Sequence, residues 1–221
     1  LQLTYEKSRL LVAIAGITFA VILMFMQIGF QDALFKSAIR LQSNLQGDLV
    51  LISPQSTNLV GMRNFSQRRL YQTLGIEGVA SVNSLYINLA AWKIPPINPD
   101  APKHPEDLPE VLPPGSTRNI LVLGVDPTAK IFNLPGVDAE NLEKIKVQDV
   151  ALFDQTSRAE FGRNIVAQVK RGETVTREVA NRKIMIEGLF TLGSSFAADG
   201  AIITSDLNFL RMFPDRKHSA A

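Results

Sequence analysis

The run of apolar residues from Leu10 to Phe30 constrains this chain more than any other feature of its sequence. Of its 21 residues, 17 are apolar and none is charged. About 20 such residues in an α-helix, rising 1.5 Å each, span the roughly 30 Å hydrocarbon core of a bilayer. The run is longer than the apolar region of a cleaved signal peptide and no small-x-small cleavage sequence follows it, so the sequence predicts an uncleaved membrane helix.

The charges on either side of this run predict its orientation. Lys7 and Arg9 precede it, and the first charge that follows is Asp32. Because positive flanks stay on the cytoplasmic side, we expect a cytoplasmic N-terminus and an inner (plasma) membrane protein whose main domain lies outside the cytoplasm.

Small residues on one face of the expected helix indicate a packing surface. Ala13, Gly16 and Ala20 are three and four residues apart, a spacing that lets a second helix approach closely. Alanine and glycine are also common in membrane helices that make no such contact, so both interpretations stay open.

The helical pattern continues beyond the apolar run. Leucine or alanine recurs on one face at positions 34, 38, 41 and 45. A single helix over 5–45 would be about 60 Å long, roughly twice the bilayer core. The excess predicts a stem that leaves the membrane and connects it mechanically to the domain that follows.

Short alternating elements after Gly47 predict a mixed α+β domain over 47–214. Residues 1–46 are expected to form a cytoplasmic tip, the membrane helix and the stem, and residues 215–221 a tail. Strands are expected at 48–53, 79–92, 119–125, 150–154, 174–180, 183–190 and 201–204, with the fifth and sixth forming a hairpin around Asn181. Helices are expected at 67–75, with Leu70 and Leu74 facing inward, at 139–145, and after Ser205. Residues 94–114 hold 8 of the 12 prolines and are expected to form an irregular insertion.

Composition excludes several classes of site. The chain has no cysteine, and its two histidines, His104 and His218, are far apart in sequence, which excludes thiolate metal sites and argues against a histidine cage or a serine triad. A formal net charge of +2 argues against a nucleic-acid binder. Phosphate-loop, GxSxG and HExxH motifs are absent.

A few residues remain as candidates for chemistry. Ser194 or Ser195, in GLFTLGSSFAADG, is a conceivable nucleophile, but no base stands beside it, and a structural loop is favoured. Arg68 and Arg69 are expected on a solvated helix face rather than in an anion site. Trp92 and Phe196 are expected in the core or an interface rather than against a ligand. The sequence therefore predicts no catalytic, cofactor-binding or metal-binding residue.

Several long blocks of the sequence resemble one known family. The blocks are MFMQIGFQDALFKSAIRLQ, GDLVLISPQS, FSQRRLYQTLGIEGV, ILVLGVDP and GLFTLGSSFAADGAIITSDLNFLRMFP. They are similar to the DevC-type permeases of cyanobacterial ABC exporters, within the wider MacB/FtsX permease family. The resemblance covers 1–214, and the insertion at 94–114 is longer than the family pattern.

The resemblance implies a fold and a set of partners. It implies a MacB-like periplasmic core domain after the first of four membrane helices, so that this chain corresponds to the N-terminal portion of a permease, as a fragment or a truncated gene product. It further implies a homodimer that works with a separate ATPase subunit holding ATP and Mg²⁺, a periplasmic membrane-fusion adaptor and a TolC-like outer-membrane channel, to export a lipid-like substrate such as a glycolipid. The alternative from the residues alone is a single-pass, membrane-anchored periplasmic hydrolase or ligand-binding protein.

Overall fold

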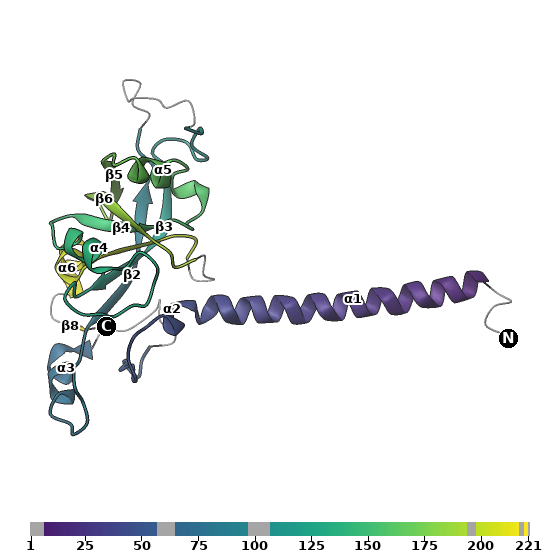
Figure 1. The fold of residues 1–221 in the computed structure, drawn as a ribbon, viewed down its shortest axis with the longest axis horizontal. Coiled ribbons are helices and arrows are strands. Elements are labelled where there is room, and N and C mark those ends of the chain that lie inside the picture. Colours follow the sequence, from purple (N-terminus) through teal and green to yellow (C-terminus); the bar gives the residue numbers. More distant parts are fainter. Residues whose placement is uncertain (1–6, 57–64, 97–106, 194–197, 217–218, 221) are drawn as a thin grey trace. The chain divides into compact units, whose positions relative to one another are not determined.

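The computed structural model describes residues 7–56, 65–96, 107–193, 198–216 and 219–220. The chain divides into two compact units, Leu1–Ile39 and Arg40–Ala221, which are described separately. Figure 1 shows the elements in chain order.

The first unit consists of the helix α1, Lys7–Ala38, and none of its side chains is buried. Of the residues described, α1 forms the helix that is long and apolar enough to cross a membrane, as judged by length and composition. The prediction of one continuous helix over 5–45 was wrong. The helix ends at Ala38, Ile39 forms a turn, and the short helix α2, Arg40–Ser43, belongs to the second unit.

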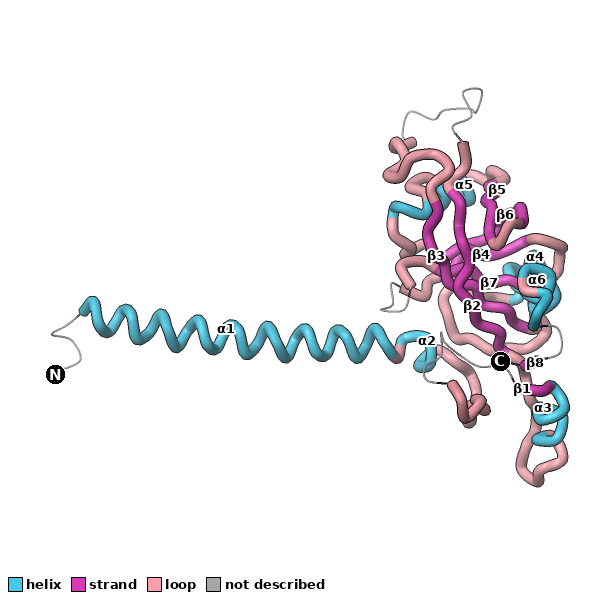
Figure 2. Tube along the Cα trace, turned by 180° about the vertical axis from the view of Figure 1, so that it is seen from behind, coloured by secondary structure: helices cyan, strands magenta, loops and turns pink. Residues whose placement is uncertain are grey.

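The second unit is built around a closed six-stranded barrel of order β2-β3-β7-β4-β6-β5, shown from behind in Figure 2. Its strands are β2 (Leu85–Lys93), β3 (Thr117–Val125), β4 (Val150–Asp154), β5 (Val175–Val179), β6 (Arg182–Phe190) and β7 (Ala201–Ser205). The pairs β3–β7 and β4–β6 are parallel, whereas the other neighbours are antiparallel. This mixture, with helices between strands, confirms an α+β class, but the closure into a barrel was not predicted.

The most apolar strands are those buried on both faces. Every residue of β4 and β7 is buried, as is the second half of β3 from Ile120 onward. Strands that alternate in sequence, such as β6, alternate in burial as well. This is the pattern expected when a strand of near-continuous apolar residues is covered on both sides.

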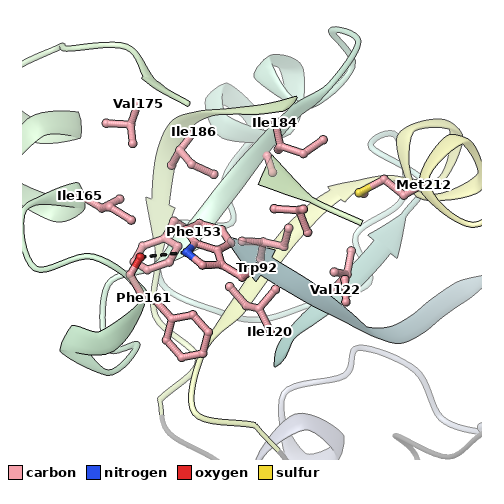
Figure 3. Close-up of a cluster of buried hydrophobic side chains, with 14 of the residues drawn as sticks. Trp92, Ile120, Val122, Phe153, Phe161, Ile165, Val175, Ile184, Ile186 and Met212 are labelled. Atoms are coloured by element: carbon pink, nitrogen blue, oxygen red, sulfur yellow. Dashed lines mark hydrogen bonds between the residues drawn. The ribbon is translucent and has the colours of Figure 1, made fainter. Parts of the chain in front are cut away.

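Two clusters of buried side chains fill the unit. Trp92 lies in the first, where its ring packs against Phe153 and Phe161, and its Nε1 donates a hydrogen bond to the carbonyl oxygen of Phe161 at 3.0 Å (Figure 3). The prediction that Trp92 lies in the core is confirmed. The second cluster lies around Leu123, Leu152 and Ile203.

The hairpin between β5 and β6 turns where the sequence predicted. Ala180 and Asn181 both have positive φ angles, 50° and 61°, as a two-residue type I′ hairpin turn requires. Arg182, the first residue of β6, donates to both carboxylate oxygens of Asp149 at 2.8–3.1 Å. This ion pair ties the hairpin to the start of β4.

Side-chain caps explain where the short helices begin. Asp138 caps α4 (Ala139–Lys144), Ser205 caps α6 (Asp206–Met212) and Ser66 caps α3 (Gln67–Thr73), each accepting a hydrogen bond from a backbone N–H of the first turn. These three predicted helices are confirmed. The remaining described elements are α5 (Ile165–Lys170), the 3₁₀ turns η2 (Ala159–Phe161) and η3 (Pro214–Arg216), and the two-residue strands β1 (Phe65–Ser66) and β8 (Ser219–Ala220).

The segment between α2 and β2 departs most from the predictions. Residues 48–53 form no strand, and Leu49, Val50, Leu51 and Ile52 are all exposed. The barrel strands pair with one another around a closed ring, which leaves this segment outside their ladder. The strand expected at 79–92 begins only at Leu85, and Leu74, expected to face inward, is exposed.

Candidate functional site

The junction at which the chain enters the barrel unit is held to two loops of that unit. The word junction here means residues 40–46 together with the residues that they contact, 131–133 and Gly193. Leu41 is 7% exposed and joins the second core cluster, so α2 is attached to the barrel by burial as well as by chain connection.

Backbone hydrogen bonds fix the residues that follow α2. Leu45 forms an antiparallel bridge with Phe132. On either side of that bridge, the N–H of Gln46 donates to the carbonyl of Ile131 at 2.7 Å, and the N–H of Asn133 donates to the carbonyl of Asn44 at 2.9 Å. The junction is therefore held by backbone bonds that survive side-chain substitution.

Arg40 adds a contact with a different part of the barrel unit. Gly193 lies three residues after β6 and has a φ of 89°. A Cβ placed on Gly193 would collide with the guanidinium of Arg40. Arg40 and Asn44 are also linked, since the side-chain amide of Asn44 donates to the Arg40 carbonyl at 2.8 Å. The junction thus contacts both the loop after β3 and the loop after β6.

The serine-containing loop lies only partly within the described residues. Ser194, Ser195 and Phe196 are outside them, so the structure does not test their predicted roles. Asp199, just beyond, pairs with Arg118 at 3.3 Å and with Arg158 at 3.0 Å. An acid held by two arginines is a structural tie that anchors the end of this loop.

Ion pairing and burial shift the pKa values of a few groups in the barrel unit. The hydrogen bonds from Arg182 hold the pKa of Asp149 below its ordinary value, and burial raises the pKa of Asp206. Burial also lowers the pKa of Arg177, whose Nε has no hydrogen-bond partner among the described residues. Each of these shifts has a local cause, either an ion pair or burial.

The other candidates from the sequence divide as follows. Ala13, Gly16 and Ala20 lie on α1 with exposed side chains, and their predicted role in helix packing stays a prediction. Arg68 and Arg69 are exposed on α3, as expected of a solvated face, and with Ser66 and Gln72 they line a shallow surface depression. His104 and His218 lie outside the described residues, and within the described ones no group of three or more His, Asp or Glu side chains could hold a metal ion.

Sequence reasoning placed residues 40–45 in a stem helix and missed the junction. The i, i+3, i+4 recurrence through Leu41 and Leu45 was interpreted as a continuation of one helix. The polar run Gln42, Ser43 and Asn44 was a signal for the end of α2 at Ser43, because serine and asparagine compete for backbone hydrogen bonds. The structure shows that competition directly, since Ser43 and Asn44 both donate to the carbonyl of Arg40.

Comparison with solved structures reveals a faint likeness to a transporter domain. No protein-family model matches the chain, and no curated protein matches it. Among solved structures, the chain is similar to the extracellular domain of the noncanonic ABC-type transporter YknZ from Gram-positive bacteria, with 10% identity, 71% of this chain and 70% of that chain covered, and a TM-score of 0.42. A likeness at this level assigns neither a family nor a function.

Proposed function

We propose that this chain is part of the permease subunit of an ABC-type exporter, located in the inner membrane with its N-terminus in the cytoplasm. In this proposal α1 crosses the membrane, the barrel unit is the periplasmic domain, and a separate ATPase subunit binds ATP and Mg²⁺. The chain itself carries out no catalysis. The sequence blocks quoted above support the proposal through their resemblance to DevC-type and MacB/FtsX permeases.

The observation that carries the proposal is the junction. A helix suited to crossing a membrane ends at Ala38, and within two residues the chain enters a segment fixed to the barrel by Leu41 and by the backbone bonds of Asn44 and Gln46. Because Ile39 alone separates α1 from this bound segment, we propose that movement of α1 reaches the barrel unit through the chain itself.

The proposed partners complete this arrangement. Movement of α1 would be driven from the cytoplasm by the ATPase subunit, with permeases paired as a homodimer. On the outer side the barrel unit would engage a periplasmic membrane-fusion adaptor and, through it, a TolC-like channel. The cargo class proposed is lipid-like, such as a glycolipid.

Deletion of the gene followed by complementation tests the function. The proposal predicts that deletion makes a lipid-like compound accumulate in the inner membrane and disappear from the outer envelope, and that the wild-type gene restores its export. Complementation with a variant lacking 40–46 is expected to fail although α1 still inserts. An unchanged distribution of lipids after deletion would contradict the proposal.

A further inference from the structure

The helix α3 is an amphipathic element whose apolar face is largely left exposed by the described part of the chain. Each residue of an α-helix advances by about 100°, so Leu70, Tyr71 and Leu74 share one side and Arg68, Arg69 and Gln72 the other. Tyr71 is 67% exposed, Leu74 46%, and Ile76, in the turn that follows, 59%. No residue of α3 is buried.

The position of α3 in the fold explains this exposure. Its main contacts are with the two short strands β1 and β8 rather than with the barrel strands. Figures 1 and 2 both show α3 beyond the end of β2, away from the barrel. Isolated exposed leucines are ordinary, whereas an aromatic and two aliphatic side chains gathered on one projecting element indicate an interaction surface.

The charges on α3 indicate what chemistry covers it. The helix sequence QRRLYQT contains two arginines and no acid. Arg68, Arg69, Ser66 and Gln72 line a shared shallow depression, and each of these side chains can donate hydrogen bonds. Such a surface complements phosphate groups, which lie above an apolar layer in a membrane that contains anionic lipids.

From these observations we propose that α3 and the turn through Ile76, residues 67–76, dock on the surface of the bilayer that contains anionic phospholipids. Tyr71, Leu74 and Ile76 enter the boundary between headgroups and acyl chains, and the two arginines contact lipid phosphates. Interfacial helices have this composition, with aromatic and aliphatic residues on the face toward the acyl chains and basic residues on the polar face.

The covalent connection of α3 to the proposed membrane helix favours a membrane, rather than a soluble acidic protein, as the partner that covers α3. A helix of seven residues binds a membrane weakly alone, since one basic residue near an anionic surface increases partitioning only about fivefold. In this chain only 28 residues separate Ala38, the last residue of α1, from Gln67, the first of α3. The inference rests on the proposed membrane anchoring by α1, which keeps α3 at a high effective concentration near lipid, and it does not depend on transport.

Site-specific labelling tests the docking directly, because the chain has no cysteine of its own. An Ile76→Cys variant of the full chain, labelled with an environment-sensitive fluorophore, is reconstituted into nanodiscs containing phosphatidylcholine with or without one-quarter phosphatidylglycerol. A Leu207→Cys variant is the matched control, since the side chains are exposed to 59% and 61%. Lipids that carry a spin-label quencher report contact with the bilayer.

In the anionic nanodiscs, the expected result is a blue-shifted emission and strong quenching of the label at position 76. In neutral nanodiscs the quenching at position 76 should be several times weaker. The label at position 207 should show little quenching in either. Arg68→Glu/Arg69→Glu should reduce the quenching at position 76 about tenfold, whereas Lys130→Glu/Lys170→Glu, with the same change of net charge, should not. Raising NaCl from about 50 mM to 500 mM should weaken the quenching at position 76 in the wild-type background, because salt screens surface charges.

Four outcomes would overturn the proposal. Equal quenching at positions 76 and 207 would show that α3 does not dock on anionic lipid. Quenching that changes neither with lipid charge nor in the Arg68→Glu/Arg69→Glu variant would show the same. A blue shift without quenching would show that protein covers the surface instead. Failure of the chain to enter nanodiscs would remove the membrane anchoring itself, whereas failure of docking alone leaves the proposed transport function standing.

Discussion

The guanidinium of Arg40 occupies the space into which a side chain at Gly193 would project. Because Gly193 also has a positive φ, two separate conditions favour glycine there. The contact joins the first residue of α2 to the loop after β6, and it makes the junction accessible to measurement.

Substitution of Gly193 tests this contact. Gly193→Ala should lower the free energy of unfolding in urea by about 1–2 kcal/mol, the cost of a left-handed backbone at a residue with a side chain. Gly172→Ala, at a similar φ of 77° with open space around it, should cost about the same. The contact with Arg40 should add little, because the guanidinium is the far end of a flexible side chain and can move aside. A cost for Gly193→Ala well above that for Gly172→Ala, removed by adding Arg40→Ala, would show instead that Arg40 is held in place.

Truncation of Leu41 tests the attachment of α2 by burial. Leu41→Ala should lower the free energy of unfolding by about 2–5 kcal/mol, the usual cost of removing a buried leucine side chain. Leu49→Ala is the control, since Leu49 is 91% exposed, and it should change that free energy by less than about 0.5 kcal/mol. Equal effects in the two variants would mean that α2 does not pack into the core.

The ion pair between Asp149 and Arg182 predicts a dependence of stability on pH. The pKa of Asp149 is lowered on folding from its ordinary value of 3.8, chiefly by the hydrogen bonds from Arg182. Its contribution is therefore fully present above pH about 4 and is lost as the pH falls through the lowered value. Between pH 5 and pH 2.5 the urea midpoint of the wild type should fall more than that of Asp149→Asn. Asp48→Asn, at an exposed position, should follow the wild type.

The serines of the loop after Gly193 distinguish the two functions considered from sequence. If the chain is a transporter subunit, Ser194→Ala/Ser195→Ala should leave export and the melting temperature unchanged, because a nucleophile is not required. The assay is recovery of export in the deletion strain. Loss of function with retained stability would favour the membrane-anchored hydrolase or ligand-binding protein instead.

Much of the barrel could be predicted because its signals are local. Ser205 and Asp138 precede their helices as caps, and Asn181 marks the hairpin. The unbroken apolar sequence in the second half of β3 indicates burial on both faces. Each depends on residues a few positions apart, which is the range over which sequence patterns are informative.

The parts that escaped prediction depend on distant partners. Closure of the barrel requires Trp92 of β2 to pair with Val179 of β5, more than 80 positions away. Residues 48–53 have the composition of a strand, but none of the described strands pairs with them. Pairing rather than composition therefore decides the outcome. The end of α1 was missed because Leu41 and Leu45 keep the helical period although the backbone turns at Ile39.

Purification of the protein from its own membranes, through an affinity tag and after mild cross-linking, tests the central claim most directly. Identification of the co-purifying proteins by mass spectrometry is predicted to reveal an ABC-type ATPase subunit with a phosphate-binding loop, in complexes that persist in detergent. Recovery of the protein without any ATPase subunit, in several detergents and with cross-linking shown to be efficient, would contradict the assignment to an ABC exporter.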